Sequence, residues 1–234
     1  MSIEICIPAF NEAPVIAESA RAVVQAFRTA KKDVVVTVAD NASTDRTADI
    51  AKGIEGVSVL TVPIRGKGAA VIAVARHSNA DFFGFIDADL SADPADIIPI
   101  LSLVERGDCD IAIGSRLTDV TKVQRGMVRT LSSRMFNILR KAIVGVDSVE
   151  DTQCGLKVMN ERGRHILALC AETGWFFDME FLARAERAGL RLREVPIRWD
   201  EHRFPERISK LHYVRDSIES VRAMFRIRRA IATK

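Results

Sequence analysis

Cysteine is scarce in this sequence and is not arranged for metal binding. The four cysteines among 234 residues (Cys6, Cys109, Cys154 and Cys170) are widely scattered, and no two form a Cys-x-x-Cys pair. This scatter argues against a zinc site and against a disulfide framework, and it is typical of a reducing compartment. We therefore expect a cytoplasmic protein.

Strong net charge and long apolar runs are also absent. The net charge is only +3, which argues against nucleic-acid binding, although a pI of 8.8 leaves room for a local basic face. No apolar run approaches the roughly 18 residues that a membrane span needs. No basic region precedes the first strand pattern. We expect no signal peptide and no transmembrane helix, so that any membrane association is peripheral, on the inner face of the membrane.

Two glycine-rich nucleotide-binding motifs are missing. No Gly-x-Gly-x-x-Gly follows the first strand pattern, where Pro8 stands instead, and no Gly-x-x-x-x-Gly-Lys-[Ser/Thr] occurs. These absences argue against a dinucleotide-binding Rossmann domain and against a P-loop enzyme.

Apolar strand patterns alternate with helical patterns along the first half of the chain, which is 48% hydrophobic overall. We expect strands at residues 3–7, 34–39, 57–62, 82–86 and 111–114, and helices at residues 11–30, 45–52, 66–78 and 94–106. Asn11 is expected to cap the first helix, with Pro14 in its first turn. This order predicts an α/β fold with a Rossmann-like, mostly parallel sheet flanked by helices.

The segment Phe85-Ile86-Asp87-Ala88-Asp89-Leu90 places two carboxylates at the end of a strand. Alternate residues of a strand point the same way, so Asp87 and Asp89 are expected to converge on one divalent cation, which prefers oxygen ligands. A lone Asp-x-Asp also occurs in solvated turns. Polar clusters that follow the other strands favour a site, because ligands of open α/β sheets bind beyond the carboxyl ends of the strands.

Several motifs then occur in a recognisable order. They are Ile7–Glu12 (IPAFNE), Asp40–Asp45 (DNASTD), Asp87–Asp89 (DAD), Gly114–Arg116 (GSR), Asp151–Gly155 (DTQCG), Phe177–Glu180 (FDME) and Glu194–Trp199 (EVPIRW). The set resembles the family 2 glycosyltransferases of the GT-A fold, and within them the polyprenyl-phosphate group of dolichyl-phosphate mannose synthase and dolichyl-phosphate glucosyltransferase. The resemblance covers roughly residues 3 to 212.

The resemblance implies an inverting, metal-dependent transfer of a hexose from UDP-glucose or GDP-mannose to a polyprenyl phosphate. It implies Mg²⁺ or Mn²⁺ held by Asp87, Asp89 and Ser91, although the family often has Gln where Ser91 stands. Two alternatives stay open: a glycosyltransferase with a soluble acceptor, and a non-catalytic nucleotide-sugar-binding subunit.

The resemblance also assigns residues to the nucleotide sugar. The expected donor contacts are Pro8, Phe10, Glu12, Asp40, Lys67, Asp87, Ala88, Asp89, Arg203 and Lys210. Gly66-Lys67-Gly68 opens a helix, whose N-terminus attracts phosphate, but a turn with a solvated lysine fits the same pattern.

The resemblance assigns the acceptor phosphate to Arg116, Arg129 and Ser133, and catalysis to Asp89, Asp178 and Arg116. Because a phosphate acceptor is already anionic near neutral pH, with a second pKa of about 6, Asp178 is not expected to act as a strong base. Charge stabilisation and positioning are expected to dominate.

We divide the chain into a catalytic domain, residues 1–211, and a basic amphipathic helix, residues 212–234. That helix fits an anionic membrane surface, a homodimer contact or packing on the core. Residues 123–144 form a second basic helical pattern, and Trp175 and Trp199 are taken as core or interface residues.

Overall fold

The computed structural model describes residues 1–116, 141, 143–200, 203–204 and 213–232. Its centre is one seven-stranded sheet in the order β3-β2-β1-β4-β6-β5-β7. The strands are β1 (Ile3–Ala9), β2 (Val35–Asp40), β3 (Val57–Thr61), β4 (Phe82–Phe85), β5 (Ile111–Ser115), β6 (Lys157–Asn160) and β7 (Leu192–Pro196). The sheet is mostly parallel, as expected, because only β6 runs antiparallel to its neighbours β4 and β5.

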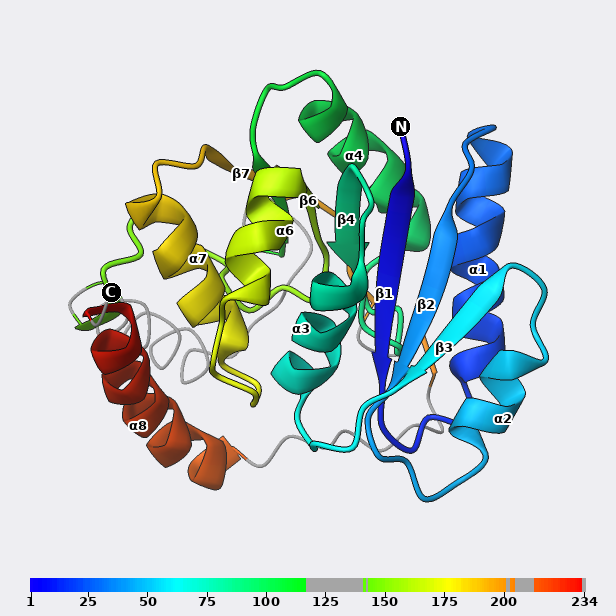
Figure 1. Cartoon of the computed structure of the whole chain (residues 1–234), viewed down its shortest axis with the longest axis horizontal. Coiled ribbons are helices and arrows are strands. Elements are labelled where there is room, and N and C mark those ends of the chain that lie inside the picture. Colours follow the sequence, from blue (N-terminus) through cyan, green and yellow to red (C-terminus); the bar gives the residue numbers. More distant parts are fainter. Residues whose placement is uncertain (117–140, 142, 201–202, 205–212, 233–234) are drawn as a thin grey trace.

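Helices cover both faces of the sheet (Figure 1). They are α1 (Ile16–Thr29), α2 (Thr47–Lys52), α3 (Lys67–His77), α4 (Ile97–Glu105, after a short 3₁₀ helix at Pro94–Asp96), α6 (Glu161–Ala168), α7 (Phe177–Arg187) and α8 (Tyr213–Ala232). α1, α2 and α4 pack on one face through one apolar cluster, and α3, α6 and α7 pack on the other through a second. α8 packs against α7.

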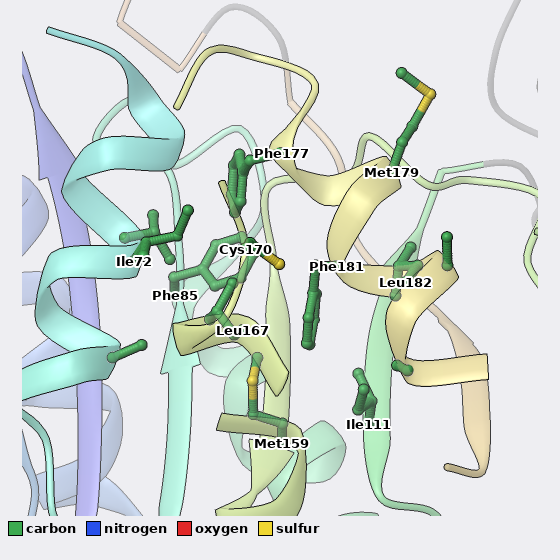
Figure 2. Packing of buried hydrophobic residues seen from close by; sticks show 14 of the residues in the cluster. Ile72, Phe85, Ile111, Met159, Leu167, Cys170, Phe177, Met179, Phe181 and Leu182 are labelled. Atoms are coloured by element: carbon green, nitrogen blue, oxygen red, sulfur yellow. The ribbon is translucent and has the colours of Figure 1, made fainter. Parts of the chain in front are cut away.

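The second cluster sits directly beneath the end of β4. Phe85, the last residue of β4, and Phe177, the first residue of α7, are both fully buried. Their ring centroids lie 5.6 Å apart, and Figure 2 shows the two rings together with Ile72 and Cys170. Burying large apolar side chains is the main stabilising contribution to such a core. This contact therefore fixes the start of α7 against the strand that leads to Asp87.

Two expectations about elements need correction, and two elements were not foreseen. The first helix begins at Ile16 with Val15 as its N-cap, because Asn11 takes a left-handed conformation with a φ of 52°. The apolar pattern at residues 195–199 predicts a late strand, but the last strand spans Leu192–Pro196 and Trp199 forms only an isolated bridge with Ala92. β6 and α6 were not expected as separate elements. The basic pattern at residues 123–144 falls almost wholly outside the described residues.

Candidate functional site

The loops after β1, β2 and β4 each turn sharply at the carboxyl edge of the sheet. Each contains one non-glycine residue with positive φ, namely Asn11 (52°), Ala42 (56°) and Leu90 (48°). Alanine and leucine rarely take this conformation, which costs free energy and persists only where surrounding structure holds it. The three turns redirect the chain just after Pro8, Asp40 and Asp87, which lie at or directly beyond the ends of β1, β2 and β4.

Asp87 lies at the centre of the site. Its Oδ1 is 2.6 Å from Nζ of Lys67, and its carboxylate packs so closely on Gly155 that a Cβ there would overlap it. Burial raises the pKa of Asp87 above its ordinary value; the Lys67 ammonium opposes this effect and the negative charge of Asp89 supports it. Two sequence motifs, Asp87–Asp89 and Asp151–Gly155, therefore meet in one contact.

Lys67 is buried and paired, so the alternative of a solvated lysine is wrong. Its side chain is only 9% exposed. Burial alone would lower the pKa of Lys67, but the negative charges of Asp87 and Asp178 outweigh burial and raise the pKa. Nζ also lies 5.5 Å from the ring centroid of Trp175. Trp175 was expected to be a core or interface residue; at 48% exposed it is not in the core, and an interface role stays a prediction.

The N-terminus of α3 is already occupied by the protein. The amide of Gly68 donates to the carbonyl of Gly174 (3.2 Å), and that of Ala69 donates to the carbonyl of Thr173 (3.0 Å). Because these amides are the ones a phosphate would use, the backbone part of the expected phosphate contact is not supported. What the segment offers to a ligand is the Lys67 side chain.

Asp89 and Ser91 follow Asp87 in a tight turn. The amide of Ser91 donates to Oδ1 of Asp89 (3.1 Å), and the carbonyl of Ala88 accepts a 2.5 Å hydrogen bond from Ser19 of α1. Within the described residues there is no group of three or more His, Cys, Asp or Glu side chains that could hold a metal. Two carboxylates suit Mg²⁺, which commonly takes one or two from the protein and its other ligands from water and substrate phosphates.

The first loop is held against the loop after β2. The amide of Asn11 donates to Oγ of Ser43 (3.0 Å), and the amide of Glu12 donates to Oγ1 of Thr47 (2.8 Å). The guanidinium carbon of Arg65 lies 4.6 Å from the ring centroid of Phe10. Sequence reasoning missed Arg65, although its position next to Gly66-Lys67-Gly68 was a signal.

Asp40 ends β2 at the same edge. The residue is 5% exposed, and Oδ1 has no hydrogen-bond partner among the residues that the structure describes. A buried carboxylate oxygen without a partner is costly, and such groups usually have a ligand or water to satisfy them. Asp40 is therefore a strong candidate for a ligand contact.

Arg116, directly after β5, is engaged by the protein itself. Its Nε and Nη2 bind the two carboxylate oxygens of Asp151 at 2.8 and 2.6 Å, and its guanidinium lies 4.9 Å from the ring centroid of Trp199. Burial alone would raise the pKa of Asp151, but hydrogen bonds and positive charge from Arg116 outweigh burial and lower it. The bidentate pair ties the Asp151–Gly155 loop to the end of β5.

Asp178 is paired with a lysine that sequence reasoning missed. Nζ of Lys157 lies 2.6 Å from Oδ1 of Asp178, and both side chains are almost completely buried, at 0% and 1% exposed. The same ammonium donates to the carbonyls of Thr152 (3.1 Å) and Cys154 (2.7 Å). A lysine within the apolar run 156–159 was the only signal in the sequence. Lys157 therefore joins β6, α7 and the loop that packs on Asp87.

Of the remaining expected residues, Arg203 and Pro8 are described and three are not. Nη2 of Arg203 lies 3.9 Å from a carboxylate oxygen of Asp93. Pro8 lies at the end of β1, next to Ala39 of β2. Arg129, Ser133 and Lys210 lie outside the described residues, so their assigned roles stay predictions.

Comparison with protein families and curated proteins gives a consistent result. A model described as glycosyl transferase family 2 matches residues 4–156. Glycosyltransferase AglD of Haloferax volcanii is 29% identical over 227 residues, which is 92% of this chain and 35% of AglD. Dolichyl-phosphate beta-glucosyltransferase of Saccharomyces cerevisiae is 34% identical over 151 residues, 58% of this chain and 45% of that protein. The chain spans less than half the length of either relative.

Solved structures with the same fold include two synthases. Glucosyl-3-phosphoglycerate synthase from Mycobacterium tuberculosis, in complex with Mn²⁺, UDP-glucose and phosphoglyceric acid, has a TM-score of 0.69 at 22% identity, covering 97% of this chain and 78% of its own. Mannosyl-3-phosphoglycerate synthase from Rubrobacter xylanophilus has a TM-score of 0.70 at 20% identity, with coverages of 97% and 73%. At these identities the likeness establishes the fold. None of the helices in the described part of the chain is long and apolar enough to cross a membrane.

Proposed function

We propose that this chain, which belongs to glycosyl transferase family 2, transfers a hexose from a nucleotide diphosphate sugar to a polyprenyl phosphate. The name of one relative, a dolichyl-phosphate beta-glucosyltransferase, supports the acceptor class. The UDP-glucose in the complex of one solved structure of the same fold supports the donor class. The observation that carries the proposal is the meeting of Asp87, Lys67 and Gly155 at the carboxyl edge of the sheet.

The donor nucleotide is assigned to the edge formed by the loops after β1 and β2. Asp40 supplies a buried oxygen without a partner among the described residues, suited to an N–H of the base. Phe10, beneath the Arg65 guanidinium, supplies an aromatic face, and Glu12 is buried beside it. An aromatic ring and a few placed polar groups are the usual components of such a pocket.

The diphosphate is assigned to Asp87, Asp89 and Ser91 through Mg²⁺ or Mn²⁺, with Lys67 beside them. Nζ of Lys67 lies 2.6 Å from Oδ1 of Asp87, so the phosphates that the cation holds would also meet this ammonium. When bound, the cation offsets negative charge on the departing nucleotide. Lys67 is positioned to hold the phosphates by charge.

The acceptor phosphate is assigned to the side of the site that carries Arg116, with Arg129 and Ser133 as its expected partners. The carboxylate of Asp178 is paired with the ammonium of Lys157. This pairing supports an electrostatic, positioning role for Asp178, and it argues against a role as a general base. The phosphate oxygen, already anionic, attacks the anomeric carbon as the bond to the nucleotide breaks. This proposal predicts inversion at that carbon.

The test is incubation of the protein with UDP- and GDP-hexoses, Mn²⁺ and a polyprenyl phosphate, with detection of a lipid-linked hexose. In parallel reactions, a soluble sugar phosphate replaces the polyprenyl phosphate as the acceptor. Product from the lipid alone supports the proposal. The proposal is contradicted if product forms only with the soluble acceptor, or if no product forms with either acceptor for any of the donors.

We predict that Asp87→Ala abolishes transfer while leaving the protein folded. Removing the carboxylate leaves Lys67 without its partner and the cation without a ligand, so we expect at least a thousandfold lower rate, about 4 kcal/mol of activation free energy. The matched control is Asp49→Ala on the exposed surface of α2, which should keep the wild-type rate. Turnover by Asp87→Ala within tenfold of the control would refute the metal assignment.

A further inference from the structure

We propose that the outward face of α8 is a docking surface for an anionic lipid bilayer. This inference rests on the proposed function, because a polyprenyl phosphate acceptor is carried in a membrane. We call the surface the arginine face, and it consists of Val221, Arg222, Phe225, Arg226, Arg228, Arg229 and Ala232.

The opposite face of α8 is already committed to the protein. Its buried side chains are Ser220, Ala223, Met224, Ile227 and Ile231. At the C-terminal end of the helix, Arg184 and Arg187 of α7 donate to the carbonyls of Ala230 (3.2 Å) and Ile231 (2.6 Å). Arginine side chains commonly satisfy the last carbonyls of a helix in this way. α8 is therefore docked in one orientation, which turns the arginine face outward.

The arginine face has the pattern of an interfacial helix. At 3.6 residues per turn, Val221, Phe225 and Ala232 form one narrow apolar stripe, with Arg228 on one side and Arg222 and Arg229 on the other. Phe225 is 51% exposed and Val221 is 36% exposed. An apolar stripe flanked by arginines lies well in the plane of a bilayer surface, with the apolar side chains in the acyl boundary and the guanidinium groups at the phosphates.

Charge favours a lipid surface over a second copy of the chain. Residues 220–232 contain four arginines, of which Arg226 is paired with Glu172, and no aspartate or glutamate. In a two-fold dimer through this face, the same patch would meet itself and bring like charges together. Anionic headgroups instead attract each arginine near the surface by about 1 kcal/mol. The complementary partner is therefore an acidic membrane.

The arginine face is connected to the catalytic edge by the loop between α6 and α7. Arg226 binds Oε2 of Glu172 with Nε and Nη2 at 3.2 and 3.0 Å. Three residues later, the half-exposed Trp175 lies over Lys67, the partner of Asp87. A lipid-borne phosphate would thus be presented on the side of the molecule that leads to the proposed site.

The experiment measures binding to vesicles by co-sedimentation, with phosphatidylcholine vesicles and vesicles containing phosphatidylglycerol. Wild-type protein should bind only the anionic vesicles, and added salt should weaken the binding. Arg222→Glu/Arg228→Glu should weaken it about 30-fold or more, the equivalent of losing two attractions of about 1 kcal/mol each. Phe225→Ala should weaken it about tenfold with little dependence on salt.

The matched control is Arg21→Glu/Lys52→Glu, the same change of charge on α1 and α2, which lie on the other side of the molecule from α8 (Figure 1). This variant should bind as the wild type does. Equal weakening by both double variants, or no binding of the wild type to anionic vesicles, would overturn the proposal. So would a wild-type dimer in light scattering that Arg222→Glu/Arg228→Glu converts to a monomer.

A second arm separates this inference from the proposed function. Transfer is measured with polyprenyl phosphate in anionic vesicles and with a short, water-soluble prenyl phosphate. The Arg222→Glu/Arg228→Glu variant should lose at least tenfold with the vesicles and nothing with the soluble acceptor. If wild-type protein uses neither acceptor, the proposed function fails, while the sedimentation result still decides the docking surface.

Discussion

Gly155 shows how a single missing side chain shapes the site. The Asp87 carboxylate occupies the space that a Cβ on Gly155 would need. Nothing about Gly155 is conformationally special, since its φ is not in the left-handed region. Glycine is required here because another residue's charged group approaches the backbone closely, a known use of glycine at ligand sites.

We predict that Gly155→Ala lowers the transfer rate about a hundredfold, because a displacement of Asp87 by even 1 Å disturbs the reacting geometry. The measurement is the transfer rate together with Mn²⁺ and donor binding by calorimetry. Gly53→Ala is the control, since a Cβ at Gly53 meets its nearest atom at an ordinary 3.5 Å. Equal activity of the two variants would show that transfer does not depend on the exact position of the Asp87 carboxylate.

The lowered pKa of Asp151 predicts that the stability of the fold depends on pH. Its pKa is lowered from an ordinary value of 3.8, so the native state holds its proton less tightly than the unfolded state. The stabilisation is therefore present above that value and is lost as the pH falls through the native pKa. Asp151→Asn should cost about 2 kcal/mol at neutral pH, since it leaves Arg116 without its partner.

The measurement for Asp151 is urea denaturation of wild type and Asp151→Asn from about pH 6 down to about pH 3. The difference in unfolding free energy should shrink as the pH falls below 3.8. Asp49→Asn, on the surface of α2, should track the wild type throughout. A difference that stays constant down to the lowest pH would contradict the ion-pair explanation.

At the scale of elements, β6 is the piece that joins the two halves of the chain. It has only four residues, Lys157–Asn160, yet it lies between β4 and β5. Its first residue, Lys157, pairs in register with Phe85 and holds Asp178 at the start of α7. The family model ends at residue 156, so this support lies just beyond the matched region.

We predict that Lys157→Met destabilises the fold by about 3–5 kcal/mol, because it leaves the Asp178 charge buried and unpaired. Lys157→Met/Asp178→Asn should recover part of that loss. Denaturation of both single variants and the double variant gives the coupling free energy. For comparison, Lys32→Met breaks a more exposed pair with Glu105 and should cost about 1 kcal/mol or less. If the changes in unfolding free energy of the two single variants add up to that of the double variant, Lys157 and Asp178 do not act as a unit.

At the scale of the whole molecule, ligand binding reports on the site as a unit. One edge of the sheet gathers several segments: the loops after β1, β2 and β4, the start of α3 and the loop before β6. A ligand that contacts several of them binds only the folded chain. Binding should therefore raise the stability of the entire domain.

We predict that one class of nucleotide sugar, with Mn²⁺ present, stabilises the protein by about 2.7 kcal/mol at a hundredfold excess over its Kd. For a chain of this size that corresponds to a rise in Tm of about 5–10 °C. Comparing UDP-glucose with GDP-mannose identifies the base, and Asp40→Ala should abolish most of the shift. A shift no larger than that from inorganic phosphate with either donor would contradict the assignment of the site.

Three features can be read from the sequence alone: the α/β class, the family resemblance and the strand that precedes Asp87 and Asp89. Apolar periodicity and residue order are local properties, so they can be read along the chain. The fold alone shows that Asn11 is no helix cap, that β6 inserts antiparallel, that Lys67 faces Asp87 and that Lys157 is buried as the partner of Asp178. These features depend on which distant segments pack together, because a charged side chain is buried only when a partner from elsewhere in the chain compensates it.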